Sequence, residues 1–380
     1  MTILALDTET TTINKGDPFD IRNRFVVGGY GTSTSCNLFT ADNTKNISTT
    51  LETTKLLILF NGKFDLHWLR RIGITIPIRL PIWDCQLAEF ILANQRKPYP
   101  ALEEACSRHG IGHKIDVIKN EYWEKGIDTD QIPSEILNEY LTQDVSLTYQ
   151  LYLKQKELFN LPEHQSKRRV FMLGCFDLLV LEEMEWNGYK FDVDAALTKA
   201  SALIKECNEI DTELAMFYPD IPINYSSPDN ISAVLYGGVV RETIKLPVGT
   251  YKTGKRAGKL KYQNVEQQYT LPRLVEPLKG SELAKEGFYS TNEDVLNSLP
   301  TKGTAKKLIS LLLKRRGLEK LRGTYYEGVP KLIREHQWQQ QLVHGNLNQC
   351  VTNTGRLSAT KPNQQNMPPD CKRLCVSRYV

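Results

Sequence analysis

The sequence lacks long apolar runs and a basic N-terminal segment. No run of apolar residues approaches the roughly 18–20 residues that a membrane-spanning helix needs. Residues 1–7 contain no Lys or Arg and end at Asp7, whereas a secretory signal opens with a basic region. We therefore expect neither a transmembrane helix nor a signal peptide.

Cysteine is sparse and unpatterned. The chain has 8 Cys in 380 residues and no Cys-x-x-Cys pair, which disulfide-rich and zinc-binding modules normally contain. Cys371 and Cys375 could supply half of a zinc site, but no second pair lies near them. We expect reduced thiols, as in a cytoplasmic protein, and no zinc.

Charge is unevenly distributed along a chain long enough for two or three domains. Residues 1–160 hold 17 Lys and Arg against 20 Asp and Glu, and residues 161–380 hold 31 against 24. Residues 301–380 are the most basic, with 15 against 4. A basic end predicts a phosphate-binding surface. The alternative is a solvated face that only keeps the protein soluble.

Short apolar strands alternate with amphipathic helices over the first ~155 residues. The expected strands are 3–6, 25–31, 36–40, 55–60 and 81–84, and the expected helices are 64–72, 86–93 and 135–158, the last capped by Ser134. This alternation is typical of an α/β layer fold with a mixed sheet.

A polar segment with a proline, 161–167, coincides with the change in charge and predicts a domain boundary. We expect one domain at 1–160 and a second at 161–380. The second is predicted to be mainly helical, with helices near 171–186, 195–217 and 304–337 and strands after residue 342. Residues 241–292 show no clear period, and their basic run 253–259 predicts a flexible loop.

Acidic residues recur at three places in the first domain. Asp7 and Glu9 close the first strand and share one side of it, because strand side chains alternate. Asp65 opens a helix after the next buried strand, where it could also be a simple cap. Tyr140 and Asp144 lie one turn apart on the long helix, where both could simply pack or face solvent. Close carboxylates repel one another, so a hard divalent cation between them is a physical way to hold them together.

Taken in order, these motifs resemble the DEDD exonuclease family, in its subclass with Tyr in the third motif. The resemblance covers about residues 1–155 and implies an RNase H-like fold and two divalent metal ions, Mg²⁺ or Mn²⁺. It implies that Asp7, Glu9 and Asp144 hold one ion, that Asp7 and Asp65 contact the second, and that Tyr140 with Glu9 orients the attacking water.

Neighbouring residues receive other roles. Asn61 and Phe64, which precede Asp65 in its motif, are predicted to contact nucleic acid. Asp84 is interpreted as a helix cap and His67 as a packed or solvated residue, not a catalytic one. Tyrosine has an ordinary pKa of about 10, which makes it a poor base near neutral pH.

The second half contains a donor-rich strand and turn segment, 344–369, with Arg356 among small residues. Such a surface can contact phosphates and minor-groove acceptors, although an ordinary loop has the same composition. Its stretch TGRLSATKPNQQNMP closely resembles the TGRLSSxxPNLQNIP segment of family A DNA polymerases. Segments 184–192, 225–231 and 313–325 resemble the opening of that polymerase domain, its SPxQL turn and its thumb helix.

This resemblance implies a thumb and palm base that bind primer–template DNA. Arg356 is expected at the minor groove near the primer end. The other residues predicted to bind DNA are Arg315, Arg322, Thr324, Asn348, Asn363 and Asn366. The family's later palm acids and its fingers helix do not follow in this sequence. We therefore expect no polymerisation by this chain alone, and a partner chain that carries fingers and palm.

The function predicted from sequence is a metal-dependent 3′→5′ proofreading exonuclease joined to the N-terminal part of a split or truncated, phage-type family A DNA polymerase. We expect it in the cytoplasm of a bacterial host. The first alternative is a stand-alone DEDD exonuclease acting on RNA or in repair. The second is a DNA-binding polymerase subunit without catalysis.

Overall fold

A computed structural model describes residues 2–77, 79–112, 117–254 and 257–377. It divides the chain into two compact units. The first unit comprises residues 1–196 and 327–380, and the second comprises residues 197–326. Among the described residues, no helix has both the length and the apolar character needed to cross a bilayer.

The first unit is built on a five-stranded mixed sheet of order β3-β2-β1-β4-β5. Its strands are β1 (Ile3–Thr10), β2 (Phe25–Gly31), β3 (Cys36–Phe39), β4 (Leu56–Leu59) and β5 (Ile82–Asp84). The first three form an antiparallel meander, and β4 and β5 run parallel to β1. The predicted α/β class with a mixed sheet is confirmed.

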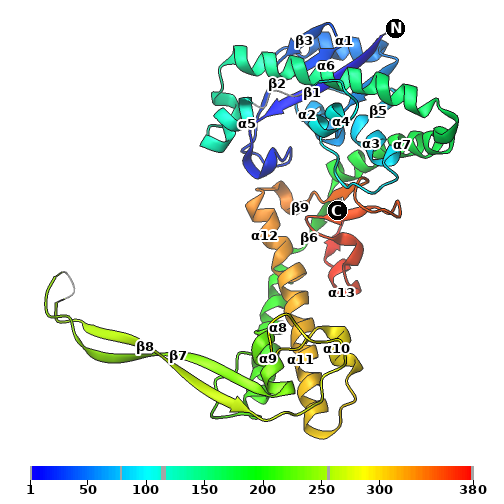
Figure 1. Cartoon of the computed structure of the whole chain (residues 1–380). Helices are drawn as coiled ribbons and strands as arrows, with labels where there is room; N and C mark the ends of the chain where they lie inside the picture. Colours follow the sequence, from blue (N-terminus) through cyan, green and yellow to red (C-terminus); the bar gives the residue numbers. More distant parts are fainter. Residues whose placement is uncertain (1, 78, 113–116, 255–256, 378–380) are drawn as a thin grey trace. The chain divides into compact units, whose positions relative to one another are not determined.

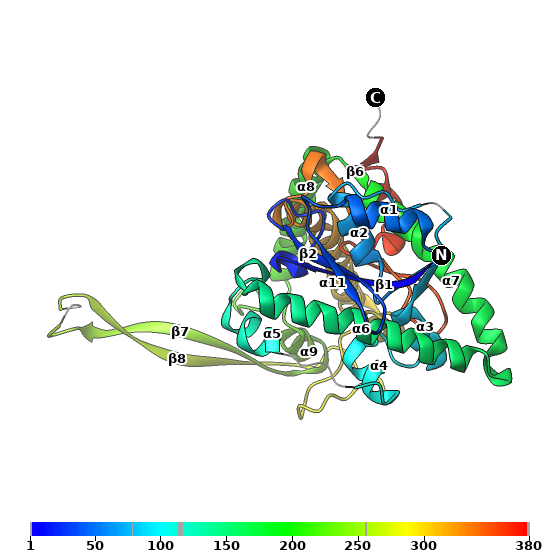
Figure 2. The same ribbon diagram turned by 90° about the horizontal axis from the view of Figure 1, so that it is seen from above.

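Helices cover both faces of this sheet (Figure 2). Helices α1 (Lys45–Thr53) and α2 (Lys63–Arg71) pack on one face, and α3 (Cys85–Leu92) and α6 (Ser134–Phe159) pack on the other. Alternate residues of β1 enter the two cores: Leu4 and Leu6 face α1 and α2, whereas Ala5 lies in the core with α3 and α6. The two-residue period of a strand thus assigns the side chains of β1 to opposite layers.

Two helix starts were predicted from sequence. Asp84 caps α3, because its side chain accepts a hydrogen bond from the Leu87 amide, and this prediction is confirmed. The cap predicted at Ser134 is wrong: Ser134 is the first residue of α6, and the capping position is Pro133, which has no side-chain acceptor. The smaller helices of this region are α4 (Leu102–Arg108) and α5 (Val117–Glu121).

Helix α7 (Gln165–Asn187) completes the packing of the first unit. Phe171 and Cys175 lie in the core that contains α3 and α6, and Leu178 lies in the core that contains α1 and α2. After α7 come a small sheet of order β12-β6-β9 and the hairpin β10–β11. These elements are β6 (Tyr189–Phe191), β9 (Leu342–Val343), β10 (Asn346–Asn348), β11 (Ser358–Thr360) and β12 (Cys375–Val376), with α12 (Gly328–Glu335) before β9 and α13 (Pro369–Lys372) before β12.

The second unit is a helical cluster that carries one long hairpin (Figure 1). Its helices are α8 (Val193–Ala215), α9 (Pro228–Tyr236), α10 (Glu293–Ser298) and α11 (Gly303–Leu321), followed by a π-helical turn at Arg322–Tyr326. Leu214, Tyr236, Leu308 and Leu312 are among the side chains of its core. The predicted helices near 195–217 and 304–337 correspond to α8 and to α11 with α12.

Residues 241–292, which show no clear period in the sequence, form an antiparallel hairpin over much of their length. Strand β7 (Gly238–Thr250) pairs with β8 (Leu260–Leu271), with a register shift between Pro247 and Gly249. Residues 255–256 of the predicted flexible loop lie outside the described residues. These strands could not be predicted from a two-residue period of apolar residues, because both faces of the hairpin are exposed for most of its length.

Candidate active site

The end of β1 presents carboxylates to one layer of the first unit and a hydroxyl to the other. Asp7 and Glu9 follow Ala5 on the side of the sheet covered by α6. Thr8 points to the opposite side, where its Oγ1 donates a hydrogen bond to Oδ1 of Asp65 over 2.7 Å. The same strand end therefore organises acids that come from both helical layers.

Three of the predicted acids converge in the structure. Asp7, Glu9 and Asp144 each offer a carboxylate oxygen, and these oxygens all lie within 4.8 Å of one another. Glu9 and Asp144 are buried and Asp7 is partly exposed. Asp144 reaches this position because α6 packs along β1 and β2. The structure thus brings together residues that lie near the two ends of the first 150 residues.

Asp65 lies beside this group and is almost fully buried, with 2% of its surface exposed. Burial raises the pKa of Asp65 well above its ordinary value, and the nearby Asp7, Asp84 and Glu9 charges raise it further, while the Thr8 hydrogen bond lowers it. Negative charges packed this closely destabilise one another unless a cation shares the site. Burial and the acidic neighbours therefore both disfavour the ionised form of the Asp65 carboxyl.

Tyr140 lies one helical turn before Asp144 on α6 and is also buried. Its ring packs edge-on against Trp123, with 6.4 Å between ring centroids. An edge-to-face aromatic pair of this geometry stabilises the position of the Tyr140 ring.

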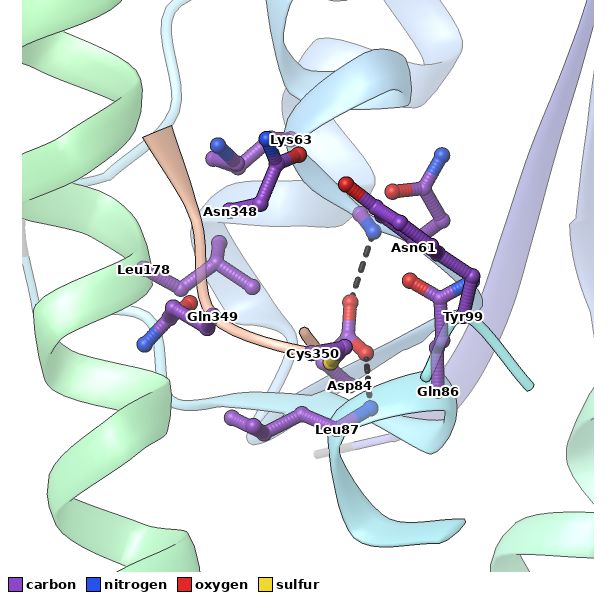
Figure 3. A pocket seen from close by; sticks show the side chains of 11 residues that line it. Asn61, Lys63, Asp84, Gln86, Leu87, Tyr99, Leu178, Asn348, Gln349 and Cys350 are labelled. Carbon is purple, nitrogen blue, oxygen red and sulfur yellow. Dashed lines mark hydrogen bonds between the residues drawn. The ribbon is translucent and has the colours of Figure 1, made fainter. Parts of the chain in front are cut away.

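Asp84 holds the turn that leads into α2. Its Oδ2 accepts a hydrogen bond from the Gly62 amide over 2.6 Å, and its Oδ1 accepts one from the Leu87 amide over 2.8 Å (Figure 3). The Gly62 contact places Asn61 and Lys63 at the start of α2, close to Asp65. Asp84 is therefore a supporting residue of the site as well as a helix cap.

His67 is packed, as predicted. It is 4% exposed, and its Nε2 lies 3.2 Å from the main-chain oxygen of Glu182 on α7. Burial lowers the pKa of His67 to about 3. The imidazole is therefore neutral at physiological pH and is not a cation for the acidic group.

Residues predicted to bind nucleic acid from both halves of the sequence meet in one groove of the first unit. This groove has a volume of about 290 Å³, and Asn61, Phe64 and Asn348 are among its lining residues. Phe19 and His344 also line it, with their rings stacked at 4.0 Å. The groove combines amide groups with aromatic faces, which can hydrogen-bond and stack with nucleotide bases.

Lys63 connects the two sides of this groove. Its Nζ lies 2.5 Å from Oε1 of Glu185 on α7, and it also donates to the main-chain oxygen of Leu347 on β10. The Leu347 amide donates to the same Glu185 oxygen over 2.5 Å. Lys63 and Glu185 carry no signal in the sequence, because a lone charge on each of two distant helices gives no pattern.

The remaining predicted contacts of the polymerase-like segment differ in exposure. Arg356, Asn363 and Asn366 are exposed around β11, and the Asn363 side chain accepts a hydrogen bond from the Asn366 amide over 3.3 Å. Asn348 is 9% exposed, and its Nδ2 donates to the Ser358 main-chain oxygen over 3.3 Å. Arg356 is thus accessible, whereas Asn348 also stabilises the β10–β11 hairpin.

Arg315 is largely buried and belongs to an ion-pair network. It is 9% exposed, and its guanidinium binds Asp211 over 2.5 Å and Glu319 over 2.8 Å. These ion pairs lie inside the second unit and engage the guanidinium group that was predicted to contact DNA. On the same predicted surface, Arg322 is half-buried in the π-helical turn and Thr324 is exposed.

The chain is similar over most of its length to DNA polymerases. Over 316 residues the chain is 28% identical to DNA polymerase I of Synechocystis sp., covering 82% of this chain and 27% of that protein. Over 340 residues it is 24% identical to the DNA polymerase of Bacillus phage SP01, covering 85% of this chain and 35% of that protein. Residues 267–378 match the family described as DNA polymerase family A.

A solved structure shares the fold. The POL domain of Pol1 from M. smegmatis, in complex with DNA primer-template and dNTP, superposes with a TM-score of 0.66 at 16% identity. The match covers 98% of this chain and 53% of that one. The chain spans about a third or less of the length of the two curated relatives described above.

Proposed function

We propose that residues 1–160 form a metal-dependent 3′→5′ exonuclease, and that the rest of the chain is the thumb and palm base of a family A DNA polymerase. The observation that carries the nuclease proposal is the convergence of Asp7, Glu9 and Asp144, whose carboxylate oxygens lie within 4.8 Å of one another. The sheet order β3-β2-β1-β4-β5, a meander extended by two parallel strands, supports the RNase H-like fold proposed for this region.

The donor set fits hard divalent cations. Asp7, Glu9 and Asp144 offer only oxygen ligands, and oxygen is what Mg²⁺ and Mn²⁺ prefer. Asp7 and Asp65 would contact a second ion, which is consistent with the raised pKa of the buried Asp65 carboxyl. When bound, such ions make hydroxide available from water near neutral pH and stabilise the charge of phosphodiester hydrolysis.

The chain's own residues then position the reactants. Tyr140, held by Trp123, orients the attacking water, and the groove lined by Asn61 and Phe64 holds the terminal nucleotides. The water oxygen bonds to phosphorus as the bond from phosphorus to the 3′-oxygen of the preceding nucleotide breaks. The 3′-oxygen gains a proton, and a 5′-mononucleotide leaves.

DNA is the proposed substrate because the homologous proteins are DNA polymerases. The matched region covers only part of those relatives, so we propose DNA synthesis only for this chain together with the remaining palm and fingers, on the same or a separate chain. A role in proofreading follows from the combination of a 3′→5′ nuclease with a primer-binding region.

The test is a nuclease assay on the full chain with a 5′-labelled single-stranded DNA. In Mg²⁺ the strand should shorten one nucleotide at a time from its 3′ end, and EDTA should stop the reaction. Asp7→Asn should reduce the rate at least about 100-fold, because it removes a ligand that stabilises the transition state. Asp42→Asn, an exposed aspartate outside the acidic group, serves as the matched control.

A second measurement separates metal binding from catalysis. Mn²⁺ binding, followed by electron paramagnetic resonance, should weaken in Asp7→Asn and stay unchanged in Asp42→Asn. Degradation by Asp7→Asn at the rate of the unmodified chain would contradict the proposal. A matched RNA strand, degraded faster than the DNA, would instead favour an RNA exonuclease.

A further inference from the structure

The β7–β8 ribbon of the second unit is a long hairpin with almost no core of its own. It is attached at its base, where Val240 and Leu271 are buried. From Lys245 to Thr250 on β7 and from Leu260 to Gln268 on β8, every residue is exposed. An isolated two-stranded hairpin is marginally stable in water and leaves its edges free to pair or bind. An exposed hairpin of this length is therefore a candidate binding surface.

The outer part of the ribbon is uniformly basic. Residues 243–265 contain no Asp or Glu. Within the described part of this segment, Lys245, Lys252, Lys259 and Lys261 are exposed, and no ion pair with a described acid engages them. The nearest acids along the strands, Glu242 and Glu266, lie toward the base and have other partners. Tyr269 donates to Glu242 over 3.4 Å, and Arg241 lies 3.5 Å from Glu266.

The register places positive charge on both faces of the ribbon. Lys245 pairs with Asn264, so it shares a face with Tyr262, two residues along β8. Lys261 lies on the opposite face, because adjacent strand residues alternate. A flat anionic surface would use one face only. A duplex groove, with phosphates along both walls, can use both faces.

Apolar side chains are interspersed with these lysines. Leu246, Val248, Leu260 and Tyr262 are each between 45% and 54% exposed. They can contact sugars and base edges while the lysines contact phosphates. The width of a two-stranded ribbon also suits this binding mode, because the major groove of B-DNA, about 12 Å wide, admits one.

We propose that the β7–β8 ribbon lies in a groove of duplex DNA, with Lys245, Lys252, Lys259 and Lys261 reaching phosphates on both strands. The choice of DNA as the nucleic acid rests on the proposed function. The family match begins at residue 267 and so does not include β7 or most of β8. The ribbon adds a duplex contact separate from the acidic site.

The test measures binding of the full chain to a fluorescent 30-base-pair duplex by anisotropy, in EDTA so that no cleavage occurs. One variant replaces the four ribbon lysines with Gln. The matched control replaces Lys45, Lys55, Lys125 and Lys154, four lysines of the first unit, with Gln. Melting temperatures should agree among the three proteins, because every substituted side chain is at least partly exposed.

The ribbon variant should bind the duplex at least about 10-fold more weakly near 0.1 M salt. Its plot of log affinity against log salt should flatten by about 3–4 units, since each phosphate contact contributes about 0.9. The control should match the unmodified chain. Equal salt slopes in the ribbon variant and the control would overturn the inference. Binding of polyglutamate, a model acidic polypeptide, is measured in the same way. If the ribbon variant bound polyglutamate more weakly than the unmodified chain but bound the duplex equally well, the result would overturn the inference in favour of an acidic protein partner.

The two proposals fail separately. If the chain degrades single strands in Mg²⁺ but substitution of the ribbon lysines leaves duplex binding unchanged, only the ribbon contact is rejected. A chain that binds duplex through the ribbon, but leaves single strands intact, rejects only the exonuclease.

Discussion

The Thr8 hydroxyl links the two helical layers of the acidic site. It donates to Asp65 on α2 while its neighbours Asp7 and Glu9 face α6. Groups that orient metal-binding carboxylates influence metal affinity and rate, although they touch neither metal nor substrate. Thr8 is thus a positioning residue of the proposed nuclease.

Replacing Thr8 with Val should reduce nuclease activity by about 10- to 100-fold, because Asp65 loses its 2.7 Å donor while the side-chain volume is kept. Thr8→Ser keeps the hydroxyl and should retain most of the activity. The measurement is the degradation rate across a Mg²⁺ titration, in which Thr8→Val should require more metal for half-maximal rate. Identical titrations for the Val and Ser variants would argue against this role.

At this scale the acidic residues could be predicted from the sequence, whereas the residues that support them could not. Asp7, Glu9 and Asp144 could be singled out because strand ends and helical spacing restrict where carboxylates point. Thr8 gave no signal, because a threonine next to two acids is ordinary. Arg315 was predicted at the DNA, but a basic run on a helix does not reveal which of its side chains turns inward to Asp211.

Cys175 provides a test of burial through pH. Burial raises the pKa of this thiol from 9.0 to about 12. A raised folded-state pKa gives stability that is present below the unfolded value of 9.0 and is lost as pH rises toward 12. The unfolded chain ionises first, so the free energy of unfolding should fall above pH 9.

Cys175→Ala should make that decline shallower, by up to about 1.4 kcal/mol per pH unit. The comparison is urea denaturation of both proteins between pH 7 and pH 10.5. The substitution also shifts stability at pH 7 by removing a buried atom, so the slope is the informative quantity. If the free energies of unfolding of the two proteins fell with the same slope above pH 9, the thiol would ionise in the folded chain as readily as in the unfolded chain, which would contradict the prediction.

At the scale of elements, burial of apolar residues determined what could be predicted. Strand β1 could be predicted from its continuous apolar run, because both of its faces are buried, and α6 could be predicted as a long amphipathic helix. The β7–β8 ribbon was missed because a strand exposed on both faces needs no apolar alternation. The supposed cap at Ser134 failed because a serine after proline fits both the capping position and the first helical turn.

Asp84 should be costly to remove, because two buried amides depend on it. Asp84→Ala leaves the Gly62 and Leu87 donors without their 2.6 and 2.8 Å acceptors, and should lower the free energy of unfolding by about 2–4 kcal/mol. Asn292→Ala, at the exposed cap of α10, is the control and should cost about 1 kcal/mol. Equal losses in urea denaturation would contradict the supporting role of Asp84.

At the scale of the whole molecule, α7 lies beyond the domain boundary predicted at residue 160 but packs within the first compact unit. Phe171 and Leu178 fill different cores on the two sides of the sheet, although both lie beyond that boundary. The predicted domains follow charge and family resemblance, whereas the compact units follow packing. A change in charge along the sequence does not show which residues complete a core.

A chain ending at residue 160 should be less stable than one ending at residue 187 by about 3–6 kcal/mol, because it lacks the buried Phe171 and Leu178. A chain ending at 187 that carries Phe171→Ala and Leu178→Ala is the matched control, and it should lose most of the difference. The measurement is urea denaturation followed by circular dichroism. Equal stability of the 160- and 187-residue chains would show that α7 is dispensable.

The small sheet β12-β6-β9 imposes an order on events during protein synthesis. Strand β6 leaves the ribosome long before its two neighbours, which lie beyond the second unit in the chain. The second unit is contiguous, so it is fully synthesised before either neighbour of β6 emerges. Until then β6 has both edges free, and the nascent chain must keep them from pairing elsewhere.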